Sequence, residues 1–313
     1  MSAGCRNEEI KKLRNEEIKK LFEKENIRFL TNEPMANHTT FRIGGPAELL
    51  ALVKSEEEIL FLLDTAKKYE LDRYIIGNGS NLLVSDKGLS GITIKMGSDF
   101  SGFFVDGECI KAQAGALLSA VSKAALSASL TGFEELSGIP ASVGGGVYMN
   151  AGAYGGEIKD VTESVRYLNP DGEIKTLSGS GLGFNYRKSA FSGTCNIILS
   201  ADFKLKWGNA GEIKEKMLDY TQRRKEKQPI NMPSCGSAFK RPEGYFAAAL
   251  IDEAGLKGYT VGGAQVSEKH SGFIVNIGSA TADDVLRLAE HIKNVVYNKF
   301  SVELEPEMKM LGF

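Results

Sequence analysis

The sequence predicts an α+β protein of three parts, with boundaries near residues 88 and 206. The chain has 313 residues, and single hydrophobic cores usually stop growing at roughly 250 to 300 residues. Short apolar runs alternate with amphipathic segments in the first two parts, whereas charged helical patterns dominate after about residue 206. We therefore expect two mixed subdomains followed by a smaller α+β domain.

Residues 1–26 are predicted to form a charged amphipathic helix. The segment RNEEIKKL occurs twice in tandem, at 6–13 and 14–21. Two copies of eight residues cannot build a repeat architecture, so we interpret the duplication as a lengthened surface helix and assign it no chemistry.

The first part, 27–88, is predicted to contain a strand-helix-strand unit. Ser55 followed by Glu58 has the spacing of a capping box, and apolar residues then recur at helical spacing to about residue 70. The flanking runs AELLALV (47–53) and RYIIG (73–77) are short and apolar enough for strands inside a sheet.

The second part, 89–206, is predicted to begin with two or three strands separated by glycine turns, over residues 91–114. An Ala- and Leu-rich helix follows at 116–130. Residues 165–177 read as a hairpin, because Pro-Asp-Gly at 170–172 is typical turn material between two alternating runs.

The third part is predicted to be built from charged helices and a few strands. Pro229 and Gly255 are typical helix stop signals, and Thr281 with Asp284 is a typical helix start. The expected elements are helices at 209–229, 245–255 and 281–299, strands at 261–267 and 272–277, and a closing strand in VELEPEMKM (302–310).

Composition and charge exclude several classes of partner. Hydrophobic content is 42%, charged content is 25% and the net charge is −2, so no basic excess favours nucleic acid or anionic lipid. The four cysteines form no CxxC pair and the three histidines share no spacing, so we expect no metal site. Without an apolar leader or a run near 18 apolar residues, we expect a cytoplasmic protein that does not bind membranes.

Two glycine-rich segments indicate a large ligand. They are GNGSNLLVSD (77–86) and GIPASVGGGVYMNAGAYGGE (138–157), and AQAGA (112–116) adds a third bare stretch. Neither matches the P-loop or the GxGxxG motif, because no Lys-Ser/Thr follows and residues 81–83 enter a strand. Each segment alone fits a tight turn, but together they favour a dinucleotide lying against main-chain N–H groups.

The motifs of the chain resemble those of the bacterial UDP-N-acetylenolpyruvoylglucosamine reductase family. The two glycine-rich segments take part in this resemblance, as do NHTTFRIGGPA (37–47), NYRKSAF (185–191), PSCGSAFKRP (233–242) and LEPEM (304–308), over residues 27–313. The resemblance implies a vanillyl-alcohol-oxidase-type (PCMH-like) fold. Its two-part FAD-binding region would span 27–88, joined by the C-terminal strand 302–313, and 89–206, and a substrate-binding domain would span 207–301.

The resemblance also implies a function. Members of the family reduce the enolpyruvyl group of UDP-N-acetylglucosamine enolpyruvate to UDP-N-acetylmuramate, with FAD as cofactor and NADPH as co-substrate, in cytoplasmic peptidoglycan synthesis. We expect the shorter, type II class of the family, because the chain has no room for an inserted loop between the hairpin and NYRKS. Another residue must then close over the substrate. We also expect a monomer.

Residue by residue, the resemblance implies three sets of functional side chains. Catalysis is assigned to Arg187, Ser237 and Glu307, and substrate binding to Tyr186, Arg224, Gln228 and Lys240. Cofactor binding is assigned to the residues Gly77, Asn78, Gly79, Ser80, Asn81, Leu82, Gly138, Ser142, Gly144, Gly145, Asn150, Gly152 and Ala153.

The reaction explains why those three catalytic residue types are needed. Adding hydride to one alkene carbon leaves an enolate that needs a cation and hydrogen-bond donors, a role that fits Arg187. A buried carboxyl of raised pKa, Glu307, can share a proton with that enolate, and a hydroxyl, Ser237, can protonate carbon if it is well placed.

Several readings remain open at the level of sequence. YRKS alone fits a surface turn, and RRKEKQ (223–228) fits a solvated helix face as well as a substrate contact. Cys235 is a rival proton donor to Ser237, and Glu305 is a rival to Glu307. Lys309 stands where the family commonly has arginine, and lysine cannot make a bidentate contact.

Two other functions compete with the reductase. An FAD-dependent oxidase or dehydrogenase of the same superfamily would carry the same cofactor motifs, but Arg187, Ser237 and Glu307 in their contexts argue against it. A binding module without catalysis is the second alternative. Protein purified without a flavin would exclude both flavoenzyme interpretations.

Overall fold

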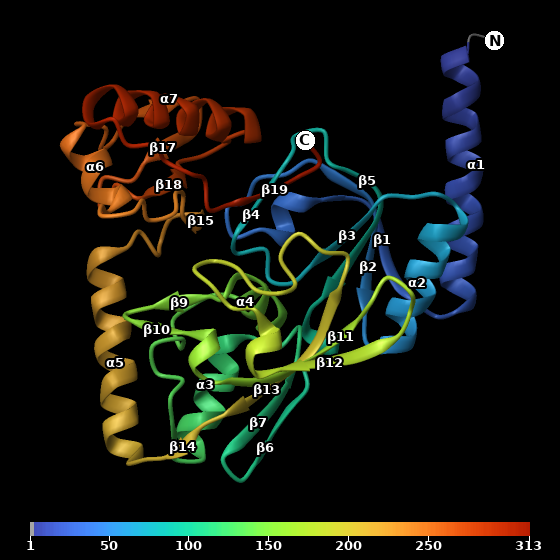
Figure 1. Ribbon diagram of the computed structural model, residues 1–313. Coiled ribbons are helices and arrows are strands. Elements are labelled where there is room, and N and C mark those ends of the chain that lie inside the picture. Colours follow the sequence, from blue (N-terminus) through green and yellow to red (C-terminus); the bar gives the residue numbers. More distant parts are fainter. Residues whose placement is uncertain (1–2) are drawn as a thin grey trace.

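The computed structural model describes the backbone of residues 3–313 and the side chains from residue 13 onward. The side chain of Cys5 and those of residues 6–12, in the first RNEEIKKL copy, lie outside the described residues. Three regions are visible in Figure 1. The first region contains α1 (Ala3–Lys24), β1 (Arg28–Pro34), β2 (Pro46–Val53), α2 (Glu56–Lys68), β3 (Arg73–Ile76), β4 (Leu82–Val84) and β5 (Leu89–Met96), with a 3₁₀ turn at Met35–His38.

The first sheet has the strand order β1-β2-β5-β3, in which only β1 is antiparallel. The predicted strand-helix-strand unit is confirmed, and β5 lies between its two strands. Ser55 caps α2 by accepting from the N–H of Glu58 at 3.3 Å, but the Glu58 carboxylate accepts from the N–H of Lys54 rather than of Ser55. The start of the helix was therefore predicted correctly and the reciprocal bond was not.

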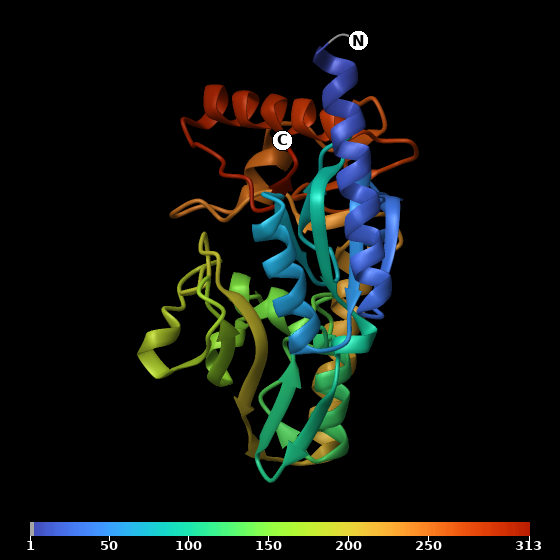
Figure 2. The same cartoon turned by 90° about the vertical axis from the view of Figure 1, so that its right-hand side faces the viewer.

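Helix α1 runs along the outside of the first region (Figure 2) and is more than a surface helix. Ile18 and Phe22 are fully buried and belong to the main hydrophobic cluster. The Phe22 ring meets the Phe29 ring edge-on with centroids 5.4 Å apart. Full burial of such side chains stabilises by about 1.5–3 kcal/mol each, so the second copy of the duplication contributes to folding through Ile18.

The second region is an antiparallel sheet covered by helices. Its strand order is β12-β11-β13-β7-β6, and α4 packs against β13 while α3 packs against β7 and β8. The predicted strands, helix and hairpin are confirmed here. The elements are β6 (Phe103–Asp106), β7 (Cys109–Gln113), α3 (Leu118–Ser127), β8 (Leu130–Thr131), α4 (Val143–Met149), β9 (Gly152–Ala153), β10 (Gly156–Glu157), β11 (Thr162–Leu168), β12 (Ile174–Ser178), β13 (Ile197–Lys204) and β14 (Lys206–Trp207), with 3₁₀ turns at Ser98–Phe100, Ile158–Asp160 and Gly179–Leu182.

The third region is a four-stranded sheet, β15-β18-β17-β16, with α6 and α7. Its helices were predicted correctly, and Thr281 and Asp284 form the expected capping box. The predicted strand 261–267 is wrong in one respect, because a turn at Gly262 and Gly263 divides it into two paired strands. The elements that follow β14 along the chain are α5 (Ala210–Lys227), β15 (Ser234–Ser237), α6 (Ala247–Glu253), β16 (Thr260–Val261), β17 (Ala264–Val266), β18 (Phe273–Asn276), α7 (Ala282–Phe300) and β19 (Lys309–Leu311).

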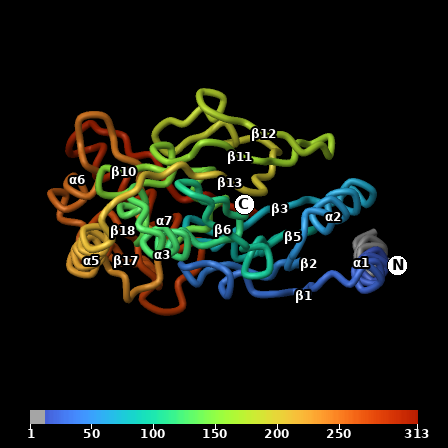
Figure 3. The backbone as a smooth tube through the Cα atoms, turned by 90° about the horizontal axis from the view of Figure 1, so that it is seen from below, coloured from blue at the N-terminus to red at the C-terminus, as the bar shows by residue number. Residues whose placement is uncertain are grey.

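The boundaries between the regions differ from the sequence prediction in two places. Strand β5 pairs with β2 and β3, so residues 89–96 belong to the first sheet, whereas the sequence predicts them in the second part. Helix α5 contacts α3 and β8 of the second region, whereas the sequence predicts it in the third (Figures 1 and 3). The C-terminal strand joins the first region as expected, because β19 pairs in parallel with β4. It is shorter than predicted, since only Lys309–Leu311 form a strand.

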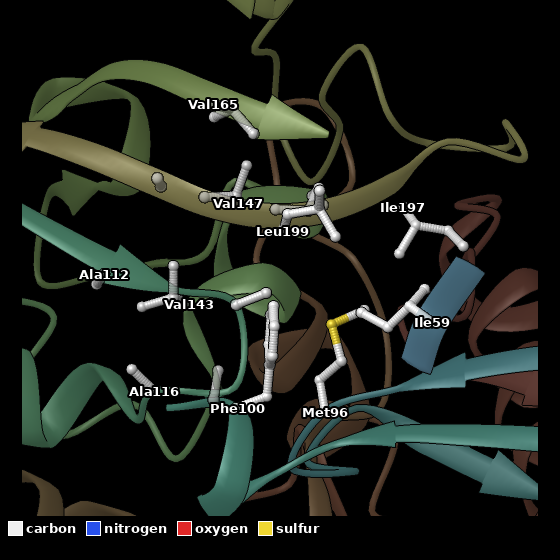
Figure 4. Close-up of a cluster of buried hydrophobic side chains, with 14 of the residues drawn as sticks. Ile59, Met96, Phe100, Ala112, Ala116, Val143, Val147, Val165, Ile197 and Leu199 are labelled. Carbon is white, nitrogen blue, oxygen red and sulfur yellow. The ribbon is translucent and has the colours of Figure 1, made fainter. Parts of the chain in front are cut away.

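Two hydrophobic clusters hold the regions together. The larger one spans the first and second regions, and Figure 4 shows Ile59 and Met96 of the first region in one cluster with Phe100, Val143 and Leu199 of the second. The smaller cluster combines the third region with Phe41, Ile43 and Leu83 of the first. The first region is therefore packed against both others, and it forms the common base on which the site is assembled.

Candidate active site

Residues 77–81, which we call the 77–81 loop, leave the sheet at the carboxyl end of β3. Gly79 has φ +66°, and a Cβ atom there would overlap the carbonyl oxygen of His38. Among residues 3–313, no protein group accepts a hydrogen bond from the backbone N–H of residues 78, 79, 80 or 81. Consecutive unused N–H groups around a left-handed glycine form an anion-binding concavity. The loop therefore fits a phosphate group.

The second glycine-rich segment, 138–157, approaches this loop from the second region. A Cβ atom at Gly77 would overlap the hydroxyl of Ser142, and the Asn78 amide donates to the carbonyl of Pro140 at 2.7 Å. The two segments that the sequence singled out therefore meet at the boundary between the first two regions. A ligand held by the loop would lie against both regions.

The 138–157 segment uses most of its polar groups inside the protein. Ser142 is buried and caps α4, which contains Gly144 and Gly145. Asn150 is fully buried at the end of that helix with φ +43°, and its side chain donates to Glu157 and to the Asn185 carbonyl and accepts from the Lys159 N–H. These side chains hold the backbone of the segment in shape, and their predicted contact with the cofactor stays a prediction.

Arg187 and Glu307 are 120 residues apart in sequence and make direct contact. The Arg187 Nε donates to Glu307 Oε1 at 2.7 Å, and the two side chains are 18% and 14% exposed. Two carbonyls of the 138–157 segment, those of Asn150 and Gly152, accept from the same guanidinium at 3.5 and 3.3 Å. The guanidinium is therefore fixed at the end of the glycine-rich segment.

Burial raises the pKa of Glu307 above its usual value, and the nearby Arg187 guanidinium opposes that rise. The desolvation of the carboxylate outweighs the ion pair, so the neutral acid is favoured more than in water. Glu305, the alternative considered from the sequence, has its pKa lowered by the contact with Lys240 and is largely exposed. The geometry therefore favours Glu307 as the acid.

Ser237 lies at the end of β15, next to the C-terminal segment that carries Glu307. The carbonyl of Ala238 accepts from the N–H of Glu307 at 2.9 Å, and Gly236 with φ +83° turns the chain immediately before Ser237. The Ser237 side chain is exposed. Cys235 is buried, and burial raises the pKa of its thiol to about 12, so the rival proton donor is withdrawn into the core.

The four predicted substrate residues are divided between two places. Tyr186 and Lys240 line a cavity of about 340 Å³ together with Asn185, Lys188, Arg241, Pro242, Glu243, Glu303 and Glu305. Arg224 instead donates to the Gly138 carbonyl, and Gln228 ends α5 outside the lining. Arg241 and Lys188 were missed, although each directly follows a residue already singled out.

Position 309, where this chain departs from the commoner arginine, lies in β19. The Lys309 ammonium is 6.0 Å from the centre of the Tyr148 ring, close enough for a weak cation–π contact. Its charge also acts on Glu307 in the direction that lowers the pKa. Lysine therefore keeps an electrostatic influence on the site, and it forms no ion pair with any side chain that the structure describes.

The fold and the 77–81 loop define a flavoprotein oxidoreductase. A sequence profile described as "FAD binding domain" matches residues 47–178, which cover the carboxyl edge of the first sheet and both glycine-rich segments. The protein has the predicted vanillyl-alcohol-oxidase-type fold, a two-part FAD-binding region with a smaller α+β domain, and FAD is its cofactor.

The chain belongs to the UDP-N-acetylenolpyruvoylglucosamine reductase family. The profile of that family's C-terminal domain matches residues 228–311. Reductases of this name from Caldanaerobacter subterraneus subsp. tengcongensis and Clostridioides difficile are 51% and 49% identical over 92% of this chain, and over 95% and 94% of their own lengths. The crystal structure of the reductase from Thermus caldophilus has a TM-score of 0.79 at 37% identity and covers 91% of this chain and 99% of its own.

The described part of the chain contains neither a membrane-spanning helix nor a cluster of metal-binding side chains. Across residues 3–313, no helix is both long and apolar enough to cross a membrane. Within the same part of the chain, no group of three His, Cys, Asp or Glu side chains is arranged to hold a metal ion.

Proposed function

We propose that the protein reduces the enolpyruvyl group of UDP-N-acetylglucosamine enolpyruvate to give UDP-N-acetylmuramate, with NADPH as the source of hydride. The observation that carries the proposal is the largely buried contact of Arg187 with Glu307 beside the two glycine-rich segments. The names of the relatives support the same substrate. We place the reaction in peptidoglycan precursor synthesis in the cytoplasm, and the active form is proposed to be a monomer.

The substrate carries an alkene conjugated with a carboxylate, so reduction must add hydride to one carbon and a proton to the other. When bound, FAD supplies the chemistry of hydride transfer, which no ordinary side chain can perform. The protein's own task is to hold the enol ether, to stabilise the enolate that forms, and to deliver the proton. Three side chains of this chain suit those tasks.

Arg187 is proposed to stabilise the enolate through its guanidinium. Two backbone carbonyls and Glu307 hold the guanidinium in one orientation, so its charge is pre-aimed and needs little reorganisation when negative charge develops. Glu307, with its raised pKa, is proposed to share its proton with the substrate carboxylate. A neutral Glu307 also leaves more of the Arg187 charge available to the enolate.

Ser237 is proposed to protonate the enolate carbon. The hydroxyl is exposed while the Cys235 thiol is buried, so only the hydroxyl is accessible to a substrate in this turn. A hydroxyl is a weak acid at neutral pH, but an enolate next to a carboxylate is a strong base, and a well-placed donor compensates for weak acidity.

The cavity beside Tyr186 and Lys240 is proposed to receive the UDP-sugar. Lys188, Lys240 and Arg241 supply positive charge for a diphosphate, and the Tyr186 ring offers an aromatic face to the ligand. Arg224, in α5, and Gln228, directly after it, are proposed to contact the substrate from outside this lining, where Arg224 donates to the Gly138 carbonyl.

The direct test is to incubate the purified holoenzyme with UDP-N-acetylglucosamine enolpyruvate and NADPH, and to follow NADPH oxidation together with the UDP-sugar product. We expect stoichiometric conversion to UDP-N-acetylmuramate, and no oxidation of NADPH beyond the background rate when the UDP-sugar is omitted. In Ser237→Ala we expect normal reduction of the flavin by NADPH and a loss of turnover of about 10²- to 10⁴-fold. Flavin-loaded enzyme that leaves the UDP-sugar unchanged would contradict the proposal.

A further inference from the structure

The 77–81 loop offers N–H groups to a phosphate but contains no cationic side chain. A diphosphate brings about two negative charges, and backbone donors alone leave them without a counter-charge. Lys95 is positioned to supply one. It lies in β5 directly beside Ile76 of β3, one residue before the loop begins.

His38 holds the ammonium of Lys95. The Lys95 Nζ lies 2.9 Å from His38 Nδ1, and the His38 Nε2 lies 3.0 Å from Glu33 Oε1. An ammonium can only donate, so Nδ1 must accept, and the ring proton is then on Nε2, which donates to Glu33. The three side chains form one oriented chain, Lys95 to His38 to Glu33.

The same histidine touches the loop through its backbone. The carbonyl of His38 packs against Gly79 so closely that a Cβ atom could not fit between them, and the N–H of Thr40 donates to the Gly79 carbonyl at 3.2 Å. One short turn therefore holds the loop with its main chain and the ammonium with its side chain.

The Lys95 ammonium still has donors to give. Among the described residues, His38 is its single hydrogen-bond acceptor, which leaves two of the three N–H groups for a ligand. Burial lowers the pKa of Lys95, and the carboxylate of Glu33 opposes that effect from beyond the imidazole. A half-buried cation whose counter-charge lies behind a neutral ring favours an additional anion.

We propose that Lys95 pairs with the diphosphate of FAD at the 77–81 loop, and that His38 and Glu33 are positioning residues that aim its ammonium. This rests on the proposed placement of the cofactor on that loop. The loop then supplies hydrogen bonds, and the neighbouring strand supplies charge.

The test is the affinity of the apoprotein for FAD, measured by titration with quenching of flavin fluorescence. Charge-assisted hydrogen bonds are worth enough that Lys95→Met should raise the Kd about 10- to 100-fold at low salt. The difference from the parent protein should shrink as salt is added, because screening weakens the lost interaction in the parent. Lys67→Met, which removes an exposed lysine from α2, is the matched control and should leave the Kd unchanged.

A second pair of variants tests the positioning role, and also covers a failure of Lys95→Met to fold. The Oδ1 of His38→Asn can replace Nδ1 as acceptor for the ammonium, whereas His38→Leu offers no acceptor. We expect His38→Asn to stay within about threefold of the parent Kd and His38→Leu to lose about tenfold or more. Equal affinities of the two variants, or of Lys95→Met and the parent, would overturn this inference alone. A parent apoprotein that does not bind FAD would overturn the proposed cofactor site itself.

Discussion

The two glycine-rich segments look alike in sequence and differ in how they use their backbones. In the 77–81 loop, the N–H groups of residues 78–81 donate to nothing within residues 3–313. In the 138–157 segment, the N–H groups of Val143 and Gly144 donate to the carbonyls of Ala116 and Ala114 at 2.7 and 2.8 Å. Glycine density alone does not identify a backbone that faces a ligand, whereas an account of unused donors does.

The second segment contributes to the site through carbonyl groups. Its Asn150 and Gly152 carbonyls accept from the Arg187 guanidinium. One segment is thus equipped to bind a phosphate, and the other to hold the Arg187 guanidinium. Changes in the first segment should alter cofactor affinity, and changes around the second should alter turnover or stability.

The largest effect is expected for Arg187→Met. Removing a pre-aimed donor from an enolate typically costs about 10²- to 10³-fold in rate, so kcat should fall by that factor while the Kd for FAD stays nearly constant. Steady-state kinetics and a flavin titration measure the two quantities. Arg223→Met, which removes an exposed arginine of α5 paired with Asp219, serves as the control. An Arg187→Met protein that bound FAD poorly but kept its turnover per bound flavin would contradict the proposed division of roles between the two segments.

Gly79→Ala should weaken the binding of FAD. The φ of +66° costs a β-carbon residue roughly 1–3 kcal/mol, and the new Cβ would also overlap the His38 carbonyl. The loop must shift, so we expect the Kd for FAD to rise about tenfold or more. Gly107→Ala separates the two causes, because Gly107 has φ +58° but no atom within 4 Å of its Cβ position. Similar losses of FAD affinity in both variants would show that backbone strain at a distant glycine lowers the affinity as much as the overlap with the His38 carbonyl.

Gly144→Ala should lower stability. Its Cβ would lie 2.9 Å from the Cβ of Ala114, and overpacking of this kind costs about 1–3 kcal/mol. Gly145→Ala makes only an ordinary contact with the Ser142 hydroxyl, so the higher helix propensity of alanine should raise stability by about 0.5–1 kcal/mol. Urea unfolding of the two apoproteins measures both free energies. Effects of the same sign would contradict the packing role assigned to Gly144.

The smallest effect concerns the pH dependence of turnover. Glu307 must be protonated to share its proton, so kcat should decline as the pH rises through the raised pKa of that carboxyl. The native state holds this proton more tightly than the unfolded chain, so the contribution of Glu307 to the free energy of unfolding also decreases over the same rise in pH. Glu307→Gln should have a lower kcat than the parent, and this kcat should no longer decline over the same rise in pH. A decline that persisted at the same pH would assign it to another group.

Local signals predicted most of the fold. The caps at Ser55 and Thr281 and the stops at Pro229 and Gly255 are read from neighbouring residues, and each helix they bound is present. The placement of β5 could not be predicted in this way. A parallel strand pairs with partners far along the chain, so the sequence near residue 89 does not state which sheet it joins.

The candidate site shows the same difference between local contacts, which the sequence predicts, and distant contacts, which it does not. Arg187 and Glu307 were named from motif resemblance, and the structure brings them together, although no spacing rule connects residues 120 apart. Helix α5, which carries Arg224, was assigned to the wrong region because helix spacing does not say which region a helix packs against. Lys95 was missed because a single lysine in an apolar strand gives no signal until its neighbours across the sheet are known.

A crystal structure of the protein with FAD bound tests the central assignment most directly. We expect diphosphate oxygens at about 2.7–3.2 Å from backbone nitrogens of residues 78–81, with Arg187 and Glu307 still paired beside the cofactor. A diphosphate held at another place, with those N–H groups bonded to the protein or to solvent, would contradict the account.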